Sequence, residues 1–279
     1  MTGIALLYDR LSRWVLLADR FGGSRRTGPP AMHKTLAEPG AAPRRRLSPH
    51  HVDLAVLDAL GPLDAPAVLD VGCGFGASAL FWRSRVGGRF DGLTLSRVQL
   101  RTARRWALRL GAADDCRFHL RSFLDPLPGP WDVVLSIESL VHSPDLAATF
   151  KALAAVLGPG GRLAMVEDMP ADGLSGPAAA AAAALARHWG GQPIPTEGEF
   201  RAALRGAGLT LLAERDLTAL VDPRPPGVLD REEARFSRLR RLPLPAVATV
   251  VDAYLGGIAL ERLYLMGAVR YRLLVAGRA

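Results

Sequence analysis

Cysteine is scarce in this sequence. Cys73 and Cys116 are the only two cysteines in 279 residues, which excludes a disulfide framework, and no Cys and His residues are spaced like the ligands of a zinc site. Small secreted domains and zinc modules are therefore excluded, and a reducing cytoplasm is the expected location. The hydrophobic content of 49% is enough for the core of a large globular protein.

Lysine is almost absent. Lys34 and Lys151 are the only lysines, although Lys and Arg together number 35 and the formal net charge is +8. A strong positive charge suggests nucleic-acid binding, because clustered cations release counterions from phosphate. The arginines are scattered, however, apart from short groups at 44–46 and 235–241. This pattern predicts a solvated basic surface with no specific nucleic-acid site. A basic RNA-binding enzyme stays open as an alternative.

Long apolar runs are also missing. The most apolar stretch near the start, residues 4–21, is interrupted by charged side chains at positions 9, 10, 13, 19 and 20, so neither a signal peptide nor a membrane span is predicted. The spacing predicts an amphipathic helix with Leu7, Leu11, Trp14 and Ala18 on one face. Such a helix packs on the protein body, covers a pocket or touches a membrane surface.

The next segment, residues 22–47, is rich in Gly, Pro and Arg and is too long for an ordinary connection. It is predicted to be a mobile lid or partly disordered. Ser48 can cap a helix whose first residue is Pro49 and which stops at Gly61. The expected organisation is an N-terminal helix and lid over 1–47, followed by a main domain over 48–279.

Strand and helix patterns alternate from residue 67 to residue 168. The strand patterns are AVLDVG, RFDGLTL, CRFHLRSF, WDVVLSIES and GRLAMVED. This alternation predicts an α/β fold whose parallel sheet is covered on both faces. The rhythm then changes. Residues 170–195 are predicted to be an insertion above the sheet, and cap elements over about 219–266 precede a last strand.

Three glycines follow the first strand in the stretch VLDVGCGFG. They fall at the carboxyl edge of the sheet, where open parallel sheets bind ligands, and Gly72, Gly74 and Gly76 leave bare main chain for a ligand to approach. A dinucleotide site needs G-x-G-x-x-G and an acid at the tip of the second strand. Here the spacing is G-x-G-x-G, and Asp91 falls inside the strand pattern. NAD is therefore not the predicted ligand.

The stretch VLDVGCGFG resembles the first motif of class I S-adenosylmethionine-dependent methyltransferases. Together with GLTLSRVQL and SIESLVHS, it resembles the small-molecule branch that includes sterol, tocopherol and cyclopropane fatty-acid enzymes. The resemblance covers roughly residues 66–168. It implies a Rossmann-like, doubly wound, mostly parallel seven-stranded sheet with a helical N-terminal lid and helical cap insertions. It also implies S-adenosylmethionine as the cofactor.

The resemblance further implies where each part of the cofactor binds. Asp70 orients the methionine end, and the three glycines let their loop pass close beneath it. Thr94, Leu95 and Gln99 are assigned to the ribose. Ser122 and Phe123 are assigned to the adenine, and Ile137 is expected to pack near the cofactor.

Polar residues after the fourth strand are the candidate catalytic groups, because this end of the strand faces the methyl group in the family. They are Glu138 and His142, which share one face if the segment forms a helical turn. The histidine can take up a proton near neutral pH, and the carboxylate can stabilise a developing cation or orient a hydroxyl. His33 closes over the site if the lid does. A structural role for both residues is the alternative.

Two departures from related families narrow the chemistry. Cyclopropane enzymes carry a glutamate directly before this histidine, whereas this chain has Val141, so cyclopropanation is not expected. Enzymes that methylate exocyclic amines of bases carry an Asn/Asp-Pro-Pro-aromatic run after the fourth strand, which SIESL does not resemble. Nucleic-acid bases are therefore not the expected acceptors.

The cap is expected to supply a hydrophobic acceptor pocket, formed by Trp189, Leu255, Ile258, Leu263 and Tyr264. The predicted activity is methyl transfer to a lipophilic small molecule, such as a terpenoid, polyketide or aromatic secondary metabolite. The methylated atom is open between carbon, oxygen and nitrogen, with carbon slightly preferred. A methyltransferase fold that catalyses a cyclisation without net methyl transfer is an alternative, and a homodimer is possible.

Overall fold

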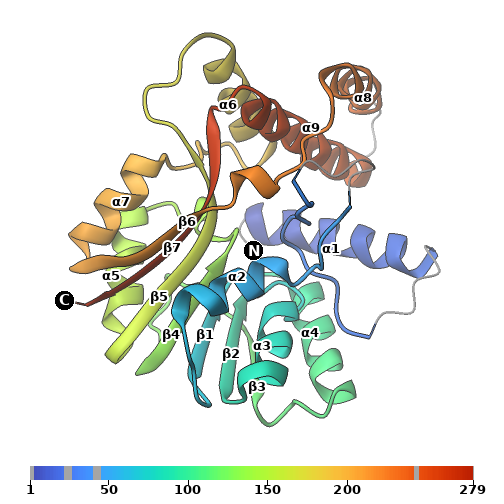
Figure 1. The fold of residues 1–279 in the computed structure, drawn as a ribbon. Coiled ribbons are helices and arrows are strands. Elements are labelled where there is room, and N and C mark those ends of the chain that lie inside the picture. Colours follow the sequence, from blue (N-terminus) through green and yellow to red (C-terminus); the bar gives the residue numbers. More distant parts are fainter. Residues whose placement is uncertain (1–2, 22–26, 40–44, 242–244, 279) are drawn as a thin grey trace.

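A seven-stranded sheet forms the centre of the computed structural model, which describes residues 3–21, 27–39, 45–241 and 245–278. The strand order is β3-β2-β1-β4-β5-β7-β6 (Figure 1). β7 runs antiparallel to β5 and β6, and the other neighbours pair in parallel. This confirms the predicted doubly wound, mostly parallel fold. The strands are β1 (Ala67–Val71), β2 (Arg89–Thr94), β3 (Cys116–Leu120), β4 (Trp131–Ile137), β5 (Leu157–Pro170), β6 (Leu209–Asp216) and β7 (Val269–Arg278).

Two layers of helices cover the sheet. Residues of α2 (His51–Leu60), α3 (Ala77–Val86) and α4 (Arg97–Arg109) share one apolar cluster, and residues of α5 (Leu146–Ala155) and α7 (Glu197–Gly206) share another. Parallel strands that are buried on both faces have near-continuous apolar sequences, as in β1 and β4. The two cores thereby hold the carboxyl ends of the strands in fixed register.

The first helix of the main domain begins later than predicted. α2 starts at His51 rather than at Pro49, because Ser48 accepts hydrogen bonds from His50, which precedes the helix, and from His51, its first residue. Its Oγ accepts from the His50 N–H, and its carbonyl accepts from the His51 N–H. The predicted end is correct, since Gly61 closes the helix with φ 74°.

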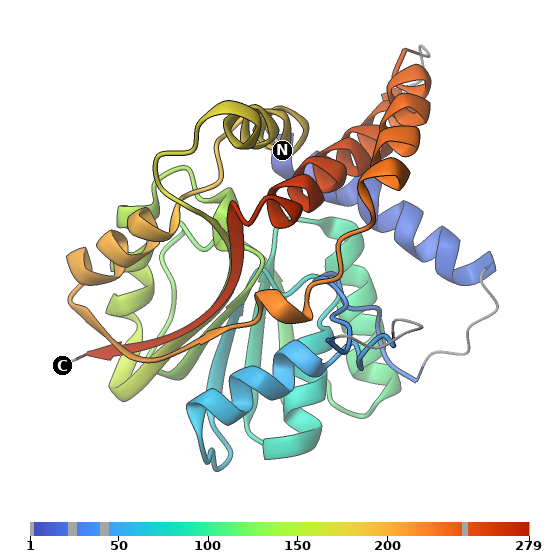
Figure 2. The same ribbon diagram turned by 45° about the horizontal axis from the view of Figure 1, so that its top comes forward.

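A helical cap lies beyond the carboxyl ends of the strands (Figures 1 and 2). α6 (Gly176–His188) and α8 (Pro226–Leu239) both pack on α9 (Pro245–Leu265). The insertion expected over 170–195 contains α6. The short 3₁₀ helix η2 (Thr218–Leu220), α8 and α9 account for the region 219–266. Within the described ranges, no helix combines the length and apolar character needed to cross a membrane.

The amphipathic helix expected at the N-terminus is α1 (Gly3–Phe21), which contacts α4 and α9. Only half of the predicted apolar face is correct. Leu7 and Leu11 turn towards the protein interior, whereas Trp14 is 44% exposed and Ala18 is also exposed. The reason is that the second half of α1 extends away from the cap (Figure 2).

The described part of the predicted lid packs on the protein body. Leu36 and Ala37 are buried, the Ala37 N–H donates to the Leu220 carbonyl at 2.8 Å, and Ala37 forms an antiparallel bridge with Arg46. The prediction also covers residues 22–26 and 40–44, which lie outside the described residues. Motion of this segment therefore stays a prediction.

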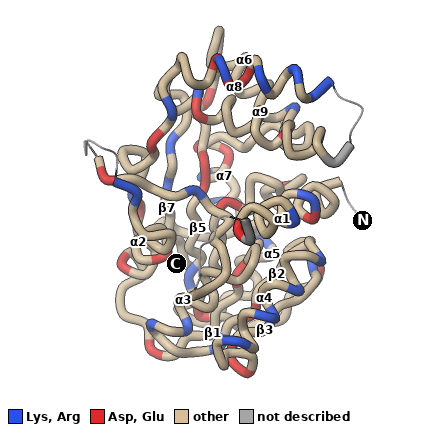
Figure 3. Tube along the Cα trace, turned by 90° about the vertical axis from the view of Figure 1, so that its right-hand side faces the viewer, with Lys and Arg blue, Asp and Glu red and all other residues tan. Residues whose placement is uncertain are grey.

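Basic and acidic residues are spread over the molecule. Figure 3 shows both kinds of position in many parts of the chain, although α4 carries five arginines and no acidic residue. Several arginines of the cap are engaged in ion pairs. Arg224 pairs with Glu232 and Glu261, and Arg262 pairs with Asp230 and Glu233. These pairs partly neutralise the positive charge of the cap.

Candidate functional site

A cavity of about 240 Å³ lies where the carboxyl ends of the strands meet α1 and the cap. It brings together most of the residues singled out in the sequence. Asp70 and Gly76 are the two predicted site residues that do not line it. The predicted residues that do line it are His33, Gly72, Gly74, Thr94, Leu95, Gln99, Ser122, Phe123, Ile137, Glu138 and His142.

Contacts within the protein already require glycine at two positions of the glycine loop. Gly72 and Gly76 have φ 86° and 80°, which side chains rarely adopt. A Cβ on Gly72 would overlap the Ser139 side chain, and one on Gly76 would press into the Phe118 ring. Gly76 therefore permits close packing of the loop on β3, and its contact with a ligand stays a prediction.

Asp70 is a buried carboxylate in β1, with one oxygen that has no hydrogen-bond partner among the described residues. Burial raises the pKa of Asp70 to about 8, and the Asp53 carboxylate adds to the shift. An unpartnered buried carboxylate is costly, and a nearby positive charge would favour its ionised form. The position is therefore suited to a cationic group of a ligand.

The corner after β2 is a connected hydrogen-bond network. The Thr94 hydroxyl donates to the Gln99 side chain at 2.6 Å, and the Ser96 hydroxyl caps α4 by accepting from the Gln99 N–H. Asp9 of α1 accepts from the Ser96 hydroxyl at 2.5 Å and from the Val98 N–H at 3.1 Å. A carboxylate at a helix N-terminus is favourable, so Asp9 fastens α1 to the corner at which Thr94 and Gln99 face the cavity.

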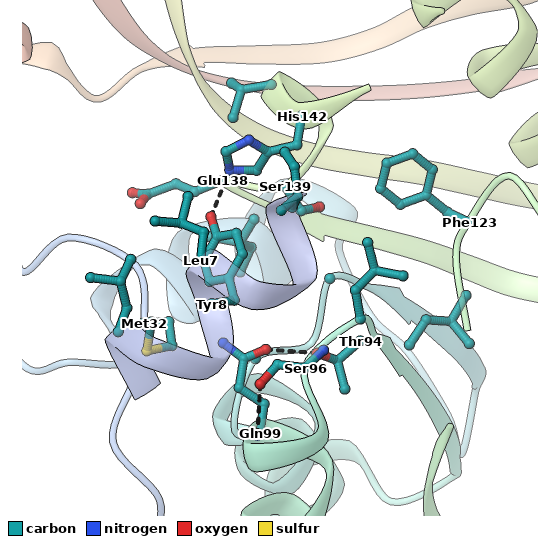
Figure 4. A pocket seen from close by; sticks show the side chains of 18 of the residues that line it. Leu7, Tyr8, Met32, Thr94, Ser96, Gln99, Phe123, Glu138, Ser139 and His142 are labelled. Carbon is teal, nitrogen blue, oxygen red and sulfur yellow. Dashed lines mark hydrogen bonds between the residues drawn. The ribbon is translucent and has the colours of Figure 1, made fainter. Parts of the chain in front are cut away.

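His142 lies at the end of the 3₁₀ turn η1 (Leu140–His142) and is hydrogen-bonded through Nε2 to the Tyr8 hydroxyl at 2.6 Å (Figure 4). Burial lowers the pKa of His142 to about 4, so the imidazole is neutral near pH 7. Burial also raises the pKa of Tyr8, which keeps the phenol protonated. The result is a neutral pair of hydrogen-bonding groups, one from α1 and one from the loop after β4.

The helical turn that would have placed Glu138 and His142 on one face is not formed. Glu138 has φ 53°, in the left-handed region, so the two side chains do not share a helix face. The Glu138 carboxylate accepts from Lys34 Nζ at 2.8 Å, from the Lys34 N–H at 3.1 Å and from the Tyr271 hydroxyl at 2.8 Å. Glu138 and His142 thus have different partners, although both line the cavity.

The Lys34 side chain reaches from the N-terminal segment to two carboxylates, those of Glu138 and Asp168. Its ammonium lies 2.8 Å from both Glu138 and Asp168, and 4.0 Å from the centre of the Tyr271 ring. Burial opposes the charged form, but Asp168 and Glu138 together raise the pKa of Lys34 above its usual value. Burial likewise opposes ionisation of Glu138, yet the Lys34 charge leaves the pKa of Glu138 below its usual value. The ion pair is therefore maintained at neutral pH.

Glu167 supports the turn that carries His142. One of its carboxylate oxygens accepts from the N–H groups of Ser139 and Leu140 and from the Ser136 hydroxyl, at 2.9–3.1 Å. Burial raises the pKa of Glu167 to about 8. Glu167 does not line the cavity, but its hydrogen bonds to Ser139 and Leu140 hold η1 in place.

The N-terminal segment also reaches the glycine loop. A Cβ placed on Gly74 would lie 3.1 Å from Met32 Cγ, and both Met32 and His33 line the cavity. The His33 Nε2 is buried without a hydrogen-bond partner among the described residues. His33 therefore lies where the sequence predicted a lid residue, although its role stays a hypothesis.

The apolar wall differs from the one expected. Among the predicted cap residues, only Trp189 lines the cavity. Leu255 and Ile258 pack against α8, and Leu263 and Tyr264 belong to the main core. α9 turns these side chains away because it must cover both α8 and the sheet. The remaining apolar lining residues are Ile4, Leu7, Leu11, Met32, Leu93, Leu95, Phe123, Ile137, Val141 and Ala253.

Several residues of the site were missed in the sequence. Tyr8 and Asp9 carry no local signal, because their partners are 134 and 87 residues away. Two other signals were available. Lys34 is one of only two lysines, and Glu167 and Asp168 form an acidic pair at the end of a buried apolar strand.

Comparisons with known proteins agree with this architecture. Residues 68–161 match a family model described as a methyltransferase domain. Methyltransferase GfsG of Streptomyces halstedii is 32% identical over 165 residues, which cover 58% of this chain and 59% of that protein. The chloroplastic tocopherol O-methyltransferase of Arabidopsis thaliana is 41% identical over 101 residues, or 36% of this chain and 29% of that one. The chain thus spans less than two thirds of either relative.

Solved structures share the fold over more of the chain. A geranyl diphosphate methyltransferase in complex with S-adenosylmethionine superposes with a TM-score of 0.63 at 25% identity, covering 82% of this chain and 84% of that one. The cyclase SpnF gives a TM-score of 0.72 over 99% of this chain and 95% of that one, but at 22% identity this likeness concerns the fold alone. Residues 68–161 therefore belong to a methyltransferase-domain family, and the glycine loop and sheet order described above are those of the class I S-adenosylmethionine-dependent methyltransferases, whose cofactor is S-adenosylmethionine.

Proposed function

We propose that this protein transfers a methyl group from S-adenosylmethionine to a lipophilic small molecule that carries an oxygen near the methylated atom. One observation carries the proposal. A single cavity joins the glycine loop to a wall of apolar side chains, and a neutral His142–Tyr8 pair lies in that wall. Small-molecule sites are typically apolar with a few placed polar groups.

The residues present fit the cofactor. The unpartnered oxygen of buried Asp70 suits the amino group at the methionine end, and Gly72 and Gly74 leave main chain bare at the cavity wall. Thr94 and Gln99 would hold the ribose, and the adenine would lie by Ser122 and Phe123. When bound, S-adenosylmethionine supplies a methyl group on a positively charged sulfur.

We assign the acceptor contact to His142 and Tyr8. At neutral pH the imidazole is uncharged, so it can accept a proton or hydrogen bond from an acceptor hydroxyl, or donate to a carbonyl, according to its tautomer. Tyr8 offers a second hydroxyl at the same place. α1 also lies over this part of the cavity and excludes water from the reacting groups.

Glu138 has a positioning role in this proposal. Its carboxylate is already bound by Lys34 and Tyr271, which reduces its capacity to stabilise a cation on the acceptor. The proposal therefore does not retain the slight preference for carbon. Curated relatives include both O- and C-methyltransferases, and the product decides between the two.

The test incubates the purified protein with S-adenosylmethionine that carries a deuterated methyl group and with a panel of hydroxylated terpenoids, polyketides and phenols. Mass spectrometry should find a product heavier by one labelled methyl group, with one S-adenosylhomocysteine formed for each product. Product without S-adenosylhomocysteine would indicate a cyclisation instead. Methylation of RNA but of no small molecule in the panel would overturn the proposal.

A further inference from the structure

Trp189 is the largest side chain that the cap contributes to the cavity. It follows the last residue of α6, and its indole N–H donates to the Ala253 carbonyl of α9 at 3.2 Å. The preceding residue, His188, contacts Asp252 at 3.1 Å through Nδ1. Two adjacent side chains therefore fasten the end of α6 to one turn of α9, and the indole is held at a fixed place in the wall.

A glycine in α9 makes room for this indole. A Cβ built on Gly256 would overlap the Trp189 ring, whereas a Cβ built on the next residue, Gly257, would meet nothing within 4 Å. Glycine is unfavourable inside a helix relative to alanine. Close approach of the indole explains the glycine at 256, and the space around Gly257 leaves that position as a matched control.

The opposite side of this end of the cavity comes from α1. Ile4 lines the cavity and approaches the residue after Trp189, since a Cβ on Gly190 would lie 3.8 Å from Ile4 Cδ1. Ala253 also lines the cavity beside the indole. The cap end is thus closed by three elements, and the planar Trp189 ring is the largest side chain among the lining residues that the cap contributes.

We infer that Trp189, held in place by the close fit to Gly256, determines acceptor specificity by limiting the length of the apolar chain that the cavity accepts. This inference rests on the proposed function, because it requires a lipophilic acceptor in the cavity. Replacing the ring with a small side chain lengthens the cavity at the cap end. Adding a methyl group at 256 displaces the ring, and the space available to the acceptor changes without any substitution in the lining itself.

The experiment uses straight-chain primary alcohols from hexanol to dodecanol as probes. Their binding to the full chain with S-adenosylhomocysteine present is measured by calorimetry. For the wild type, affinity should rise with chain length and then stop rising at a limit. Trp189→Ala should move the limit to longer alcohols and tighten binding of the first excluded alcohol by about tenfold, because each newly buried methylene adds affinity. Gly256→Ala should move the limit, and Gly257→Ala should leave it unchanged.

Binding of S-adenosylhomocysteine to each variant is the control for folding and should stay within about threefold of the wild type. A limit that is unchanged in both Trp189→Ala and Gly256→Ala overturns the inference while leaving the proposed function intact. An equal shift in Gly256→Ala and Gly257→Ala overturns the role of the close fit. If no alcohol binds the wild type, both the inference and the lipophilic acceptor are wrong. If Gly256→Ala does not fold, Trp189→Ala and Trp189→Phe decide, with a smaller shift expected for phenylalanine.

Discussion

In the proposed assignment, the half of the cavity that takes the cofactor and the half that takes the acceptor are built in different ways. The cofactor half comes from loops at the ends of successive strands, so its residues are set by local turns and by the register of a buried sheet. The acceptor half comes from α1, the N-terminal segment, the cap and the loop after β4. Single polar contacts join these elements, such as Tyr8–His142 between α1 and that loop and Arg10–Thr249 between α1 and α9. The first half depends on the fold, and the second half depends on a few side chains.

The largest effect is expected from the ion pair that joins the two halves. Lys34→Met leaves Glu138 and Asp168 without their cation, and breaking a buried pair by removing one partner costs about 3–5 kcal/mol. Thermal unfolding should therefore shift downward by about 6 °C or more. Lys151, the only other lysine, is exposed, so Lys151→Met is the control and should change the unfolding temperature little. Equal shifts would show that the pair contributes nothing specific.

The next largest effect is expected on turnover, from substitutions in the acceptor half. His142→Ala is expected to lower kcat by about 10²-fold, the usual size of a lost acid-base group, while the Kd for S-adenosylhomocysteine changes only a few-fold. Glu138→Gln should lower kcat less and also lower stability, because it weakens the contact with Lys34. Near-normal turnover in His142→Ala with the true acceptor would contradict the assignment. A loss of cofactor affinity would place His142 in the other half.

Substitutions in the cofactor half should change the affinity for the cofactor and the number of protons released when it binds. Asp70→Asn removes the charge expected at the ligand amino group and should weaken S-adenosylhomocysteine binding by about tenfold or more, since hydrogen bonds to charged groups contribute about 1.5–3 kcal/mol. NAD should bind neither form well. Tighter binding of NAD than of S-adenosylhomocysteine would contradict the assignment of this half.

The raised pKa of Asp70 gives a pH test of the same site. In the free protein the carboxyl stays protonated up to about pH 8, whereas its unfolded pKa is near 3.8. The folded state therefore binds more protons between these values, and this group lowers stability as the pH rises through that window. A ligand cation should favour the carboxylate, so binding at pH 7 should release a proton. Calorimetry in two buffers of different ionisation enthalpy detects it, and Asp70→Asn should abolish the release.

The smallest effect is expected where α1 meets the ribose corner. Asp9→Ala removes the acceptor for the Ser96 hydroxyl and the Val98 N–H, and loss of such a cap costs about 1 kcal/mol. Arg13, an exposed residue on the same helix, is the control. Denaturant unfolding should separate Asp9→Ala from Arg13→Ala. Identical midpoints would mean that α1 is held by its apolar face alone.

These contrasts explain what could be predicted from the sequence. Five successive strands and the last strand follow from local patterns, because each depends on its own apolar sequence and the turn beside it. The placement of Thr94, Gln99 and Phe123 at the cavity is what the resemblance to the methyltransferases implies. The partners of Glu138 could not be predicted, because Lys34 and Tyr271 are 104 and 133 residues away in the chain. The direction in which Leu255 and Ile258 point depends on which neighbour α9 covers, and no periodicity in α9 alone decides that.

The position of α1 has a consequence for synthesis of the chain. This helix is made before α9, yet Arg10 of α1 donates to Thr249 of α9 across 239 residues. Its docking site on α9 is missing until every element from α2 to α8 has been made. Contacts between distant segments form late because long loops must close first. A chain that stops before α9 would have its glycine loop and most of its sheet residues but an incomplete cavity. Enclosure of the cavity by α1 is therefore tied to synthesis of α9.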